Sequence, residues 1–74
     1  MGYYIGQKLK DIKENRRGLV IQITKISNSS FFITGIVIKG DKNGVYKIGD
    51  KTMLTEEILD RNFKDISNNN IKKL

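Results

Sequence analysis

The sequence predicts a mainly all-β domain: a small barrel of five short strands with one short helix near the C-terminus. Its 74 residues are enough for a single domain. Apolar runs rich in β-branched residues alternate with clusters of Gly, Asn, Asp and Ser at short intervals, which is typical of small barrels and sandwiches. No run approaches the ~20 apolar residues of a membrane-spanning helix. The domain is expected to span residues 1–66, with a polar tail at 67–74.

The first element is open to two interpretations. Ile5, Leu9 and Ile12 have the spacing of one face of a helix, and Gly18 would then cap its end. The same segment also fits a strand over residues 7–13 that pairs with the next strand across a tight turn. A strand completes a barrel without an exposed edge, so we expect a strand here. An α+β fold with an N-terminal helix is the alternative.

The two best strands follow. The clearest covers residues 19–26, where every second residue from Leu19 to Ile23 is apolar and the residues between them include polar ones. The next covers residues 31–38 and is apolar on both faces, so we expect it at the centre of the sheet. Gly35 lies inside this strand, where a glycine marks a bulge or a bend.

Residues 40–44 form the strongest turn pattern in the chain, and Asn43-Gly44 suits a type I′ hairpin turn. Two further short strands are predicted beyond it, over residues 45–48 and 51–54. Gly49-Asp50 is the predicted turn between them. These two strands complete the expected five.

The segment after the last strand has the pattern of a short helix. Thr55 fits the N-cap, and the two glutamates that follow it lie where the helix dipole favours negative charge. Leu59, Phe63 and Ile66 fall at i, i+4 and i+7, so the helix is expected to carry an apolar stripe. We expect this stripe to cover an open end of the sheet.

The net charge of +6 and a pI near 9.7 favour an anionic partner. Lysine outnumbers arginine by 11 to 3, however, and surface lysine also serves solubility. If residues 13–18 form a hairpin tip, its two arginines project where they can contact phosphates. The nucleic-acid-binding residues predicted on this basis are Lys13, Arg16, Arg17, Lys25, Lys39, Lys42 and Lys47. The alternative is that they are solvated turn and strand positions.

A second set of residues points to a protein interface. Phe31 and Phe32 are adjacent, so both cannot face one small core, and one of them is expected to be exposed beside Val37 or Ile33. Tyr3 and Tyr4 begin a segment that can add to a sheet edge. The interface candidates are therefore Tyr3, Tyr4, Phe31, Phe32 and Val37. The alternative is that the helix or the N-terminal segment covers them.

The chain lacks the side chains on which most enzymes depend. It has no His and no Cys, which excludes the commonest general base, the strongest nucleophile and metal sites built on these residues. The eight carboxylates fall in turns and in the predicted helix, where capping and solvation explain them. We expect neither catalysis nor a metal or cofactor. The absence of a secretory signal pattern predicts a cytoplasmic protein without membrane contact.

Three segments, together with the two β-branched strands, carry a resemblance to a known class. They are the opening Ile5-Gly6-Gln7, the segment Tyr46-Lys47-Ile48-Gly49-Asp50, and a closing Leu-x-x-Asn-Phe-x-x-Ile over residues 59–66. In this layout the chain resembles the small SH3-like β-barrel proteins encoded by phages and other mobile elements. The resemblance covers roughly residues 5–66 and implies a five-stranded SH3-like barrel. No functional residue carries over, because such proteins share no common site.

The resemblance implies a stoichiometric, non-catalytic interaction protein that binds and modulates or inhibits a host macromolecule, such as a protein of a host defence system. The basic charge argues against mimicry of DNA, because a mimic needs an acidic surface. A nucleic-acid-binding accessory protein that uses the basic hairpin is the alternative function. A third is a homo-oligomer that sequesters a small ligand between its copies.

Overall fold

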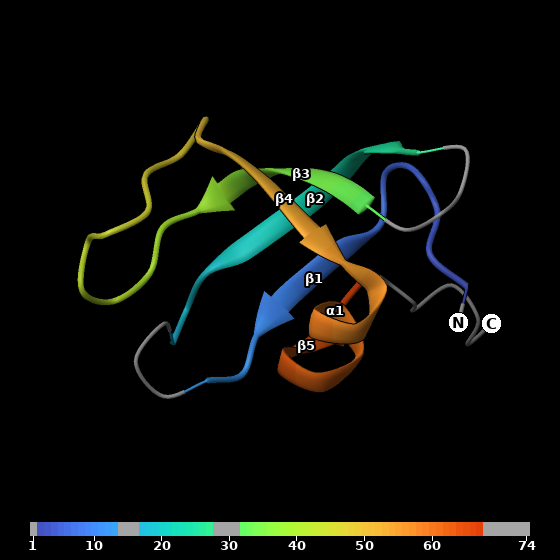
Figure 1. Ribbon diagram of the computed structural model, residues 1–74. Coiled ribbons are helices and arrows are strands. Elements are labelled where there is room, and N and C mark those ends of the chain that lie inside the picture. Colours follow the sequence, from blue (N-terminus) through green and yellow to red (C-terminus); the bar gives the residue numbers. More distant parts are fainter. Residues whose placement is uncertain (1, 14–16, 28–31, 68–74) are drawn as a thin grey trace, which may run out of the picture.

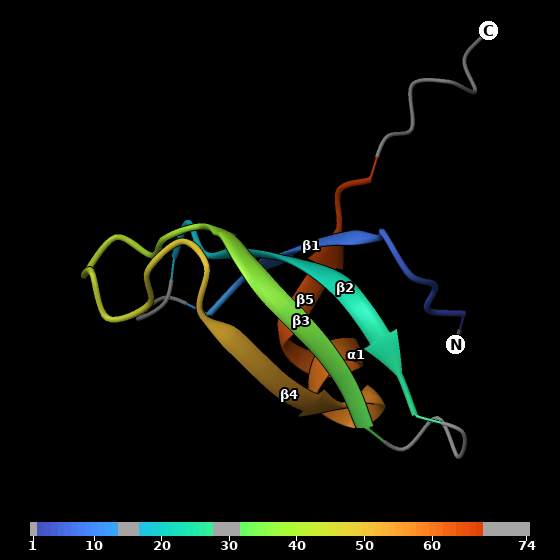
Figure 2. The same ribbon diagram turned by 90° about the horizontal axis from the view of Figure 1, so that it is seen from above.

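A computed structural model describes residues 2–13, 17–27 and 32–67. One antiparallel sheet holds five strands in the order β4-β3-β2-β1-β5. The strands are β1 (Lys8–Asp11), β2 (Val20–Ile26), β3 (Phe32–Lys39), β4 (Lys51–Thr55) and β5 (Phe63–Asp65), and α1 (Glu56–Asn62) connects the last two. The helix lies against one face of the sheet, so the domain has two layers (Figures 1 and 2).

The first four strands form a meander, and β5 returns to pair with β1. β4 and β5 therefore stand at the two edges of the sheet, joined through α1 and not paired with each other. The sheet remains open between β4 and β5, whereas a closed barrel was predicted from the sequence. The alternative N-terminal helix is wrong, because Leu9 pairs with Ile21 in a ladder of β1 with β2.

The core lies on the sheet face that α1 covers. Its buried residues come from alternate positions of three strands, from the residue before β2 and from the helix: Leu9, Leu19, Ile21, Ile23, Ile33, Val37 and Leu59. The predicted inward face of the strand over residues 19–26 is thus confirmed. Val37, predicted at an exposed interface, is only 1% exposed. It shares the inner face of β3 with Ile33 because side chains four positions apart on a strand point the same way.

β3 lies between β2 and β4, as its two apolar faces predicted. The register of β2 against β3 shifts between Ile23 and Lys25, and Ile23 is the partner of Gly35 at this shift. A Cβ atom on Gly35 would lie 3.2 Å from Cδ1 of Ile21. The glycine therefore allows two strands to approach closely beside a bulge, which agrees with the expected role of Gly35.

The predicted strand over residues 45–48 is wrong, since this segment belongs to the long loop between β3 and β4. The carboxylate of Asp41 accepts hydrogen bonds from the backbone N–H of Asn43 at 3.2 Å and of Tyr46 at 2.7 Å. The Asp41 carbonyl also accepts from the N–H of Gly44 at 3.1 Å, so the turn is centred one residue before Asn43-Gly44. The carboxylate of one buried side chain thus binds backbone N–H groups that, in a strand, would be available to pair with a neighbouring strand.

The helix starts where the sequence predicted and ends earlier. Thr55 is its N-cap, and the Thr55 hydroxyl accepts from the N–H of Ile58 at 3.2 Å. Phe63, predicted inside the helix, is its C-cap, with an extended φ of −125° and ψ of 154°. Its N–H still donates to the Leu59 carbonyl, but the chain then runs on as β5, where Phe63 pairs with Asp11. Pairing with β1 replaces the predicted last turns of the helix.

The C-terminal boundary of the sheet includes one residue of the predicted tail. The N–H of Lys8 donates to the Ser67 hydroxyl at 2.9 Å, and the N–H of Ile66 donates to the Lys8 carbonyl at 3.0 Å. The rest of the predicted tail, residues 68–74, lies outside the described residues. Within the described ranges, no helix is both long and apolar enough to cross a membrane.

Candidate functional site

The sheet face opposite the core carries a row of lysines. Exposed Lys8 and Lys10 alternate along β1 with buried Leu9 and Asp11. Cross-strand pairing extends this outer face over the whole sheet, because residues opposite each other in a ladder point the same way. We call the surface formed by five exposed lysines on this side the lysine face: Lys8, Lys10, Lys25, Lys51 and Lys64.

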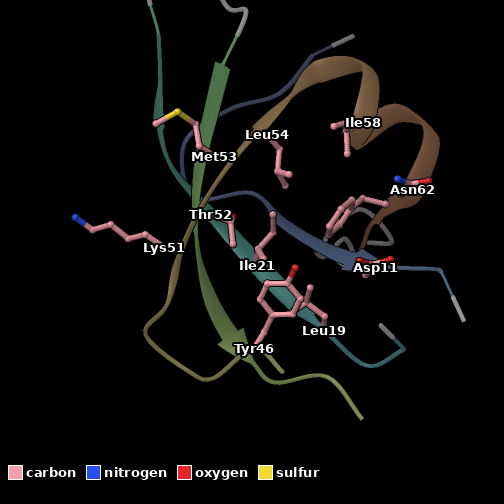
Figure 3. Close-up of a pocket in the computed structure, with 11 residues that line it drawn as sticks. Asp11, Leu19, Ile21, Tyr46, Lys51, Thr52, Met53, Leu54, Ile58 and Asn62 are labelled. Atoms are coloured by element: carbon pink, nitrogen blue, oxygen red, sulfur yellow. The ribbon is translucent and has the colours of Figure 1, made fainter. Parts of the chain in front are cut away.

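The ladder register places these lysines on common rows. One row runs from Lys8 through Gln22 and Ile36 to Lys51, crossing four strands. At the β4 end, Figure 3 shows Lys51 pointing away from the cavity that Leu54 lines. With strands spaced ~4.8 Å apart, the lysine face is about 19 Å wide from β5 to β4.

Lys10 and Lys64 are direct cross-strand partners, and Lys8 follows Lys10 on the same face of β1. Like charges placed opposite each other destabilise a sheet. Among the described residues, no carboxylate lies within ion-pair distance of these three lysines; the ion pair that is present, Glu57 with Arg61 at 2.8 Å, is on α1. Three lysines therefore lie on adjacent strands with no ion pair to a described carboxylate.

The described carboxylates all lie away from the lysine face. They occupy the inner side of the sheet, the loop between β3 and β4, α1, and β5 next to Ser67: Asp11, Asp41, Asp50, Glu56, Glu57, Asp60 and Asp65. Asp65 is engaged locally, since hydrogen bonds from the backbone and hydroxyl of Ser67 and from the Gln7 amide lower its pKa below the usual value. The outer face of the sheet thus carries lysines and none of the described carboxylates.

A small hollow lies on the same outer side, at the end of the sheet where β2 ends and β3 begins. It has a volume of about 220 Å³ and is lined by Lys25, Ser27, Phe32, Thr34 and Met53. Phe32 is 44% exposed and Met53 is 64% exposed. The hollow therefore combines an aromatic ring, a thioether and an ammonium group beside the lysine face.

The cations predicted from the sequence lie mostly at another place, the opposite end of the sheet. The N–H of Lys42 donates to the Arg17 carbonyl at 2.9 Å, so the two loops that carry them lie side by side. Lys39, the last residue of β3, is the ladder partner of Val20, which also pairs with Lys10, so Lys39 lies at the margin of the lysine face. Lys47 lies within the second loop. Lys13 follows β1 at the same end.

Two of the predicted cations stand apart from this loop cluster. Lys25 lies near the far end of β2, on the lysine face. Arg16 lies outside the described residues. Sequence reasoning missed Lys8, Lys10 and Lys64. The alternation of Lys8 and Lys10 was visible once a strand was expected there, but Lys64 was assigned to the helix.

The predicted interface residues also separate. The Tyr3 hydroxyl donates to the Asp60 carboxylate on α1, and burial together with this hydrogen bond raises the pKa of Tyr3 above its usual value. Tyr4 is 51% exposed, and its N–H donates to Oε1 of Gln7 at 3.0 Å. Phe31 lies outside the described residues. Tyr3 therefore anchors the N-terminal segment, while Phe32 and Tyr4 remain exposed.

A larger groove runs along the open line of the sheet, between β4 on one side and α1 and β1 on the other (Figure 3). It has a volume of about 450 Å³. Its lining is mainly apolar: Leu19, Ile21, Tyr46, Met53, Leu54, Ile58 and Phe63, with Asp11, Lys51, Thr52 and Asn62. Asp11 is 1% exposed and accepts a hydrogen bond from the N–H of Lys13 at 2.8 Å.

The groove follows a free backbone edge. Because β4 pairs with β3 on one side only, the backbone N–H and C=O groups of alternate β4 residues point away from β3. Val37 exchanges hydrogen bonds with Gly49 and Asp50, and the alternation continuing from there directs the backbone groups of Lys51 and Met53 outward. An extended chain lying in the groove would meet these groups.

No group of three His, Cys, Asp or Glu side chains arranged to hold a metal ion occurs among the described residues. No protein-family model, no curated protein and no solved structure matches the chain.

Proposed function

We propose that this chain is a non-catalytic binding protein and that its lysine face binds nucleic acid. The observation that carries the proposal is the juxtaposition of Lys8, Lys10 and Lys64 on adjacent strands, none of them in an ion pair with a described carboxylate. Phosphate groups bound there would replace the mutual repulsion of the lysines by attraction, and they would release counterions into solution.

A polyanion suits this surface better than a small anion does. The lysines are spread over about 19 Å and four strands, whereas a single phosphate contacts only neighbouring ammonium groups. A nucleic acid presents one phosphate per nucleotide along its whole length. The net charge of +6 adds long-range attraction, which raises the rate of encounter with such a partner.

The test compares two triple variants by fluorescence anisotropy with labelled oligonucleotides at several salt concentrations. The first is Lys8→Gln/Lys10→Gln/Lys64→Gln. The second, Lys13→Gln/Lys42→Gln/Lys47→Gln, removes the same charge from the loop cluster. We expect the first variant to weaken binding at least tenfold and to lower the slope of log K against log salt by about 2 to 3.

The loop variant is expected to change both quantities much less. Equal losses in the two variants would show that net charge alone matters, and binding that neither salt nor the first variant changes would overturn the proposal. Larger losses in the loop variant would move the site to the loop cluster that the sequence analysis predicted.

The groove along β4 favours a second candidate function, the stoichiometric binding of a host protein. An extended segment of such a protein would pair with the outward backbone groups of Lys51 and Met53 and place an apolar side chain beside Leu54 and Phe63. Lys51→Pro removes an outward N–H and leaves the β3–β4 ladder intact, while Lys51→Ala removes only the side chain. Capture of one defined protein from a nuclease-treated lysate should be lost with proline and kept with alanine.

We propose further that the sheet belongs to the SH3-like class. A four-strand meander, a fifth strand that returns to β1, and a helix between β4 and β5 support this assignment. A phage or mobile-element origin, an inhibitory role against host defence, and a ligand-sequestering oligomer stay predictions.

A further inference from the structure

The hollow beside Phe32 has the composition of a site for a flat, partly polar ring. Its volume of about 220 Å³ is of the size of a single ring system. Phe32 and Met53 offer an aromatic face and a polarisable sulfur, and both contribute exposed apolar surface. The hydroxyl-bearing Ser27 and Thr34 also line it.

The backbone around the hollow is held in place from both sides. The N–H of Ser27 donates to the Phe32 carbonyl at 3.0 Å, and the N–H of Phe32 donates to the Ser27 hydroxyl at 3.3 Å. On the other side, Thr34 is the ladder partner of both Lys25 and Met53. The ring of Phe32 therefore projects from a fixed strand end, which lowers the entropy cost of stacking a ligand on it.

Two lysines of the lysine face stand next to the hollow. Lys25 lines it directly, and Lys51 lies two residues before Met53 on the same side of β4, at a spacing of about 7 Å along the strand. From there the row of Lys51, Ile36, Gln22 and Lys8 leads back across the sheet. A chain of phosphates can thus follow the lysines while a base attached to it enters the hollow.

We infer that the nucleic acid is single-stranded and that the hollow of Phe32, Met53 and Lys25 holds one of its unpaired bases. This inference rests on the proposed function of the lysine face. In a duplex the bases are paired and stacked, so their flat faces are covered, whereas a single strand can turn a base onto an aromatic side chain. Every base has a flat face, so the site predicts little sequence preference.

The test uses three labelled probes of the same length: a single strand of mixed sequence, its duplex, and a single strand made of abasic sites. The hollow variants are Phe32→Ala and Met53→Ser, and the control is Ile48→Ser, which alters a residue that is 74% exposed in the loop between β3 and β4. Thermal unfolding followed by circular dichroism verifies that each variant is folded. If Phe32→Ala does not fold, Met53→Ser still tests the hollow.

We expect the wild type to prefer the single strand to the duplex. Each hollow variant should lose at least about fivefold in affinity for the single strand, the loss of one stacked base, while the salt slope and the abasic-probe affinity stay unchanged. Ile48→Ser should match the wild type. If the lysine variant weakens binding but the hollow variants behave like Ile48→Ser, the base site is wrong and the proposed function stands. If no probe binds, the proposed function itself fails.

Discussion

The buried polar side chains of this domain organise its backbone. Asp41, which is 7% exposed, gathers two N–H groups of its own loop, and Gly40 packs against the same loop. A Cβ on Gly40 would lie 2.8 Å from the Tyr46 carbonyl oxygen. Gln7, 4% exposed, joins the N-terminal segment to β5 through Asp65. Single side chains thus fix loops that a core of this size does not reach.

Replacing Asp41 by Ala should lower the free energy of unfolding by about 1–3 kcal/mol, because two backbone N–H groups lose a hydrogen bond to a charged acceptor. The measurement is urea unfolding followed by circular dichroism. Asp50→Ala is the matched control, since Asp50 is exposed and accepts one N–H, that of Lys47 at 2.9 Å. A loss in Asp50→Ala as large as in Asp41→Ala would contradict the role assigned to Asp41.

Tyr3 predicts a loss of stability in alkaline solution. Its pKa is raised in the folded protein, mainly by burial and also by the hydrogen bond to Asp60, so the folded state holds the proton more tightly than the unfolded state. Stability from this group is complete below pH 10 and declines as the pH rises further. Tyr3→Phe has no such proton to lose. The difference in thermal midpoint between wild type and Tyr3→Phe should shift against the wild type between pH 9 and 11.5, and a constant difference would refute this.

At the scale of elements, local patterns predicted much of the fold. Alternation identified the strand over residues 19–26, a run that is apolar on both faces identified the strand over residues 31–38, and the Thr55 cap fixed the start of the helix. The predictions were wrong where the structure of a segment depends on a strand partner far away in the sequence or on a hydrogen bond to a single side chain. Residues 45–48 have strand composition but give an N–H to Asp41, and Phe63 has helical spacing but pairs with β1. Neither competing interaction has a pattern in the local sequence.

The helix depends on Leu59 for its existence. α1 has seven residues, too few to be stable alone in water, so packing must hold it. Leu59 is fully buried, and Leu59→Ala should cost about 2–5 kcal/mol, comparable to the entire net stability expected of so small a core. Thermal unfolding by circular dichroism should show little or no folded protein. Ile58→Ala, at a position 36% exposed, should remain folded; if Leu59→Ala does too, α1 is not held by this contact.

Over the whole molecule, one surface differs from the rest in charge: the outer side of the sheet carries five lysines and none of the described carboxylates. Elsewhere both signs occur together, as in the loop between β3 and β4 and in the Glu57–Arg61 ion pair of α1. Composition predicted an excess of positive charge but not its location. Lys10 and Lys64 lie opposite each other only because β5 returns to pair with β1. Lys64 was predicted to be in the helix, and a helix there gives no reason to place the two lysines together.

The pairing of Lys10 with Lys64 allows the effect of one substitution on nucleic-acid binding to be distinguished from its effect on stability. Lys64→Glu places an acid opposite Lys10, so the free energy of unfolding should rise by about 0.2–1 kcal/mol. The same change removes a phosphate contact and adds a repulsive charge, so affinity for an oligonucleotide should fall at least fivefold, measured by anisotropy beside urea unfolding. Lys42→Glu changes the net charge equally in the loop cluster and should affect both quantities less. If Lys64 serves binding at a cost in stability, its replacement raises the free energy of unfolding and lowers the affinity for the oligonucleotide. Unchanged affinity in Lys64→Glu would show that the lysine face is not the nucleic-acid site.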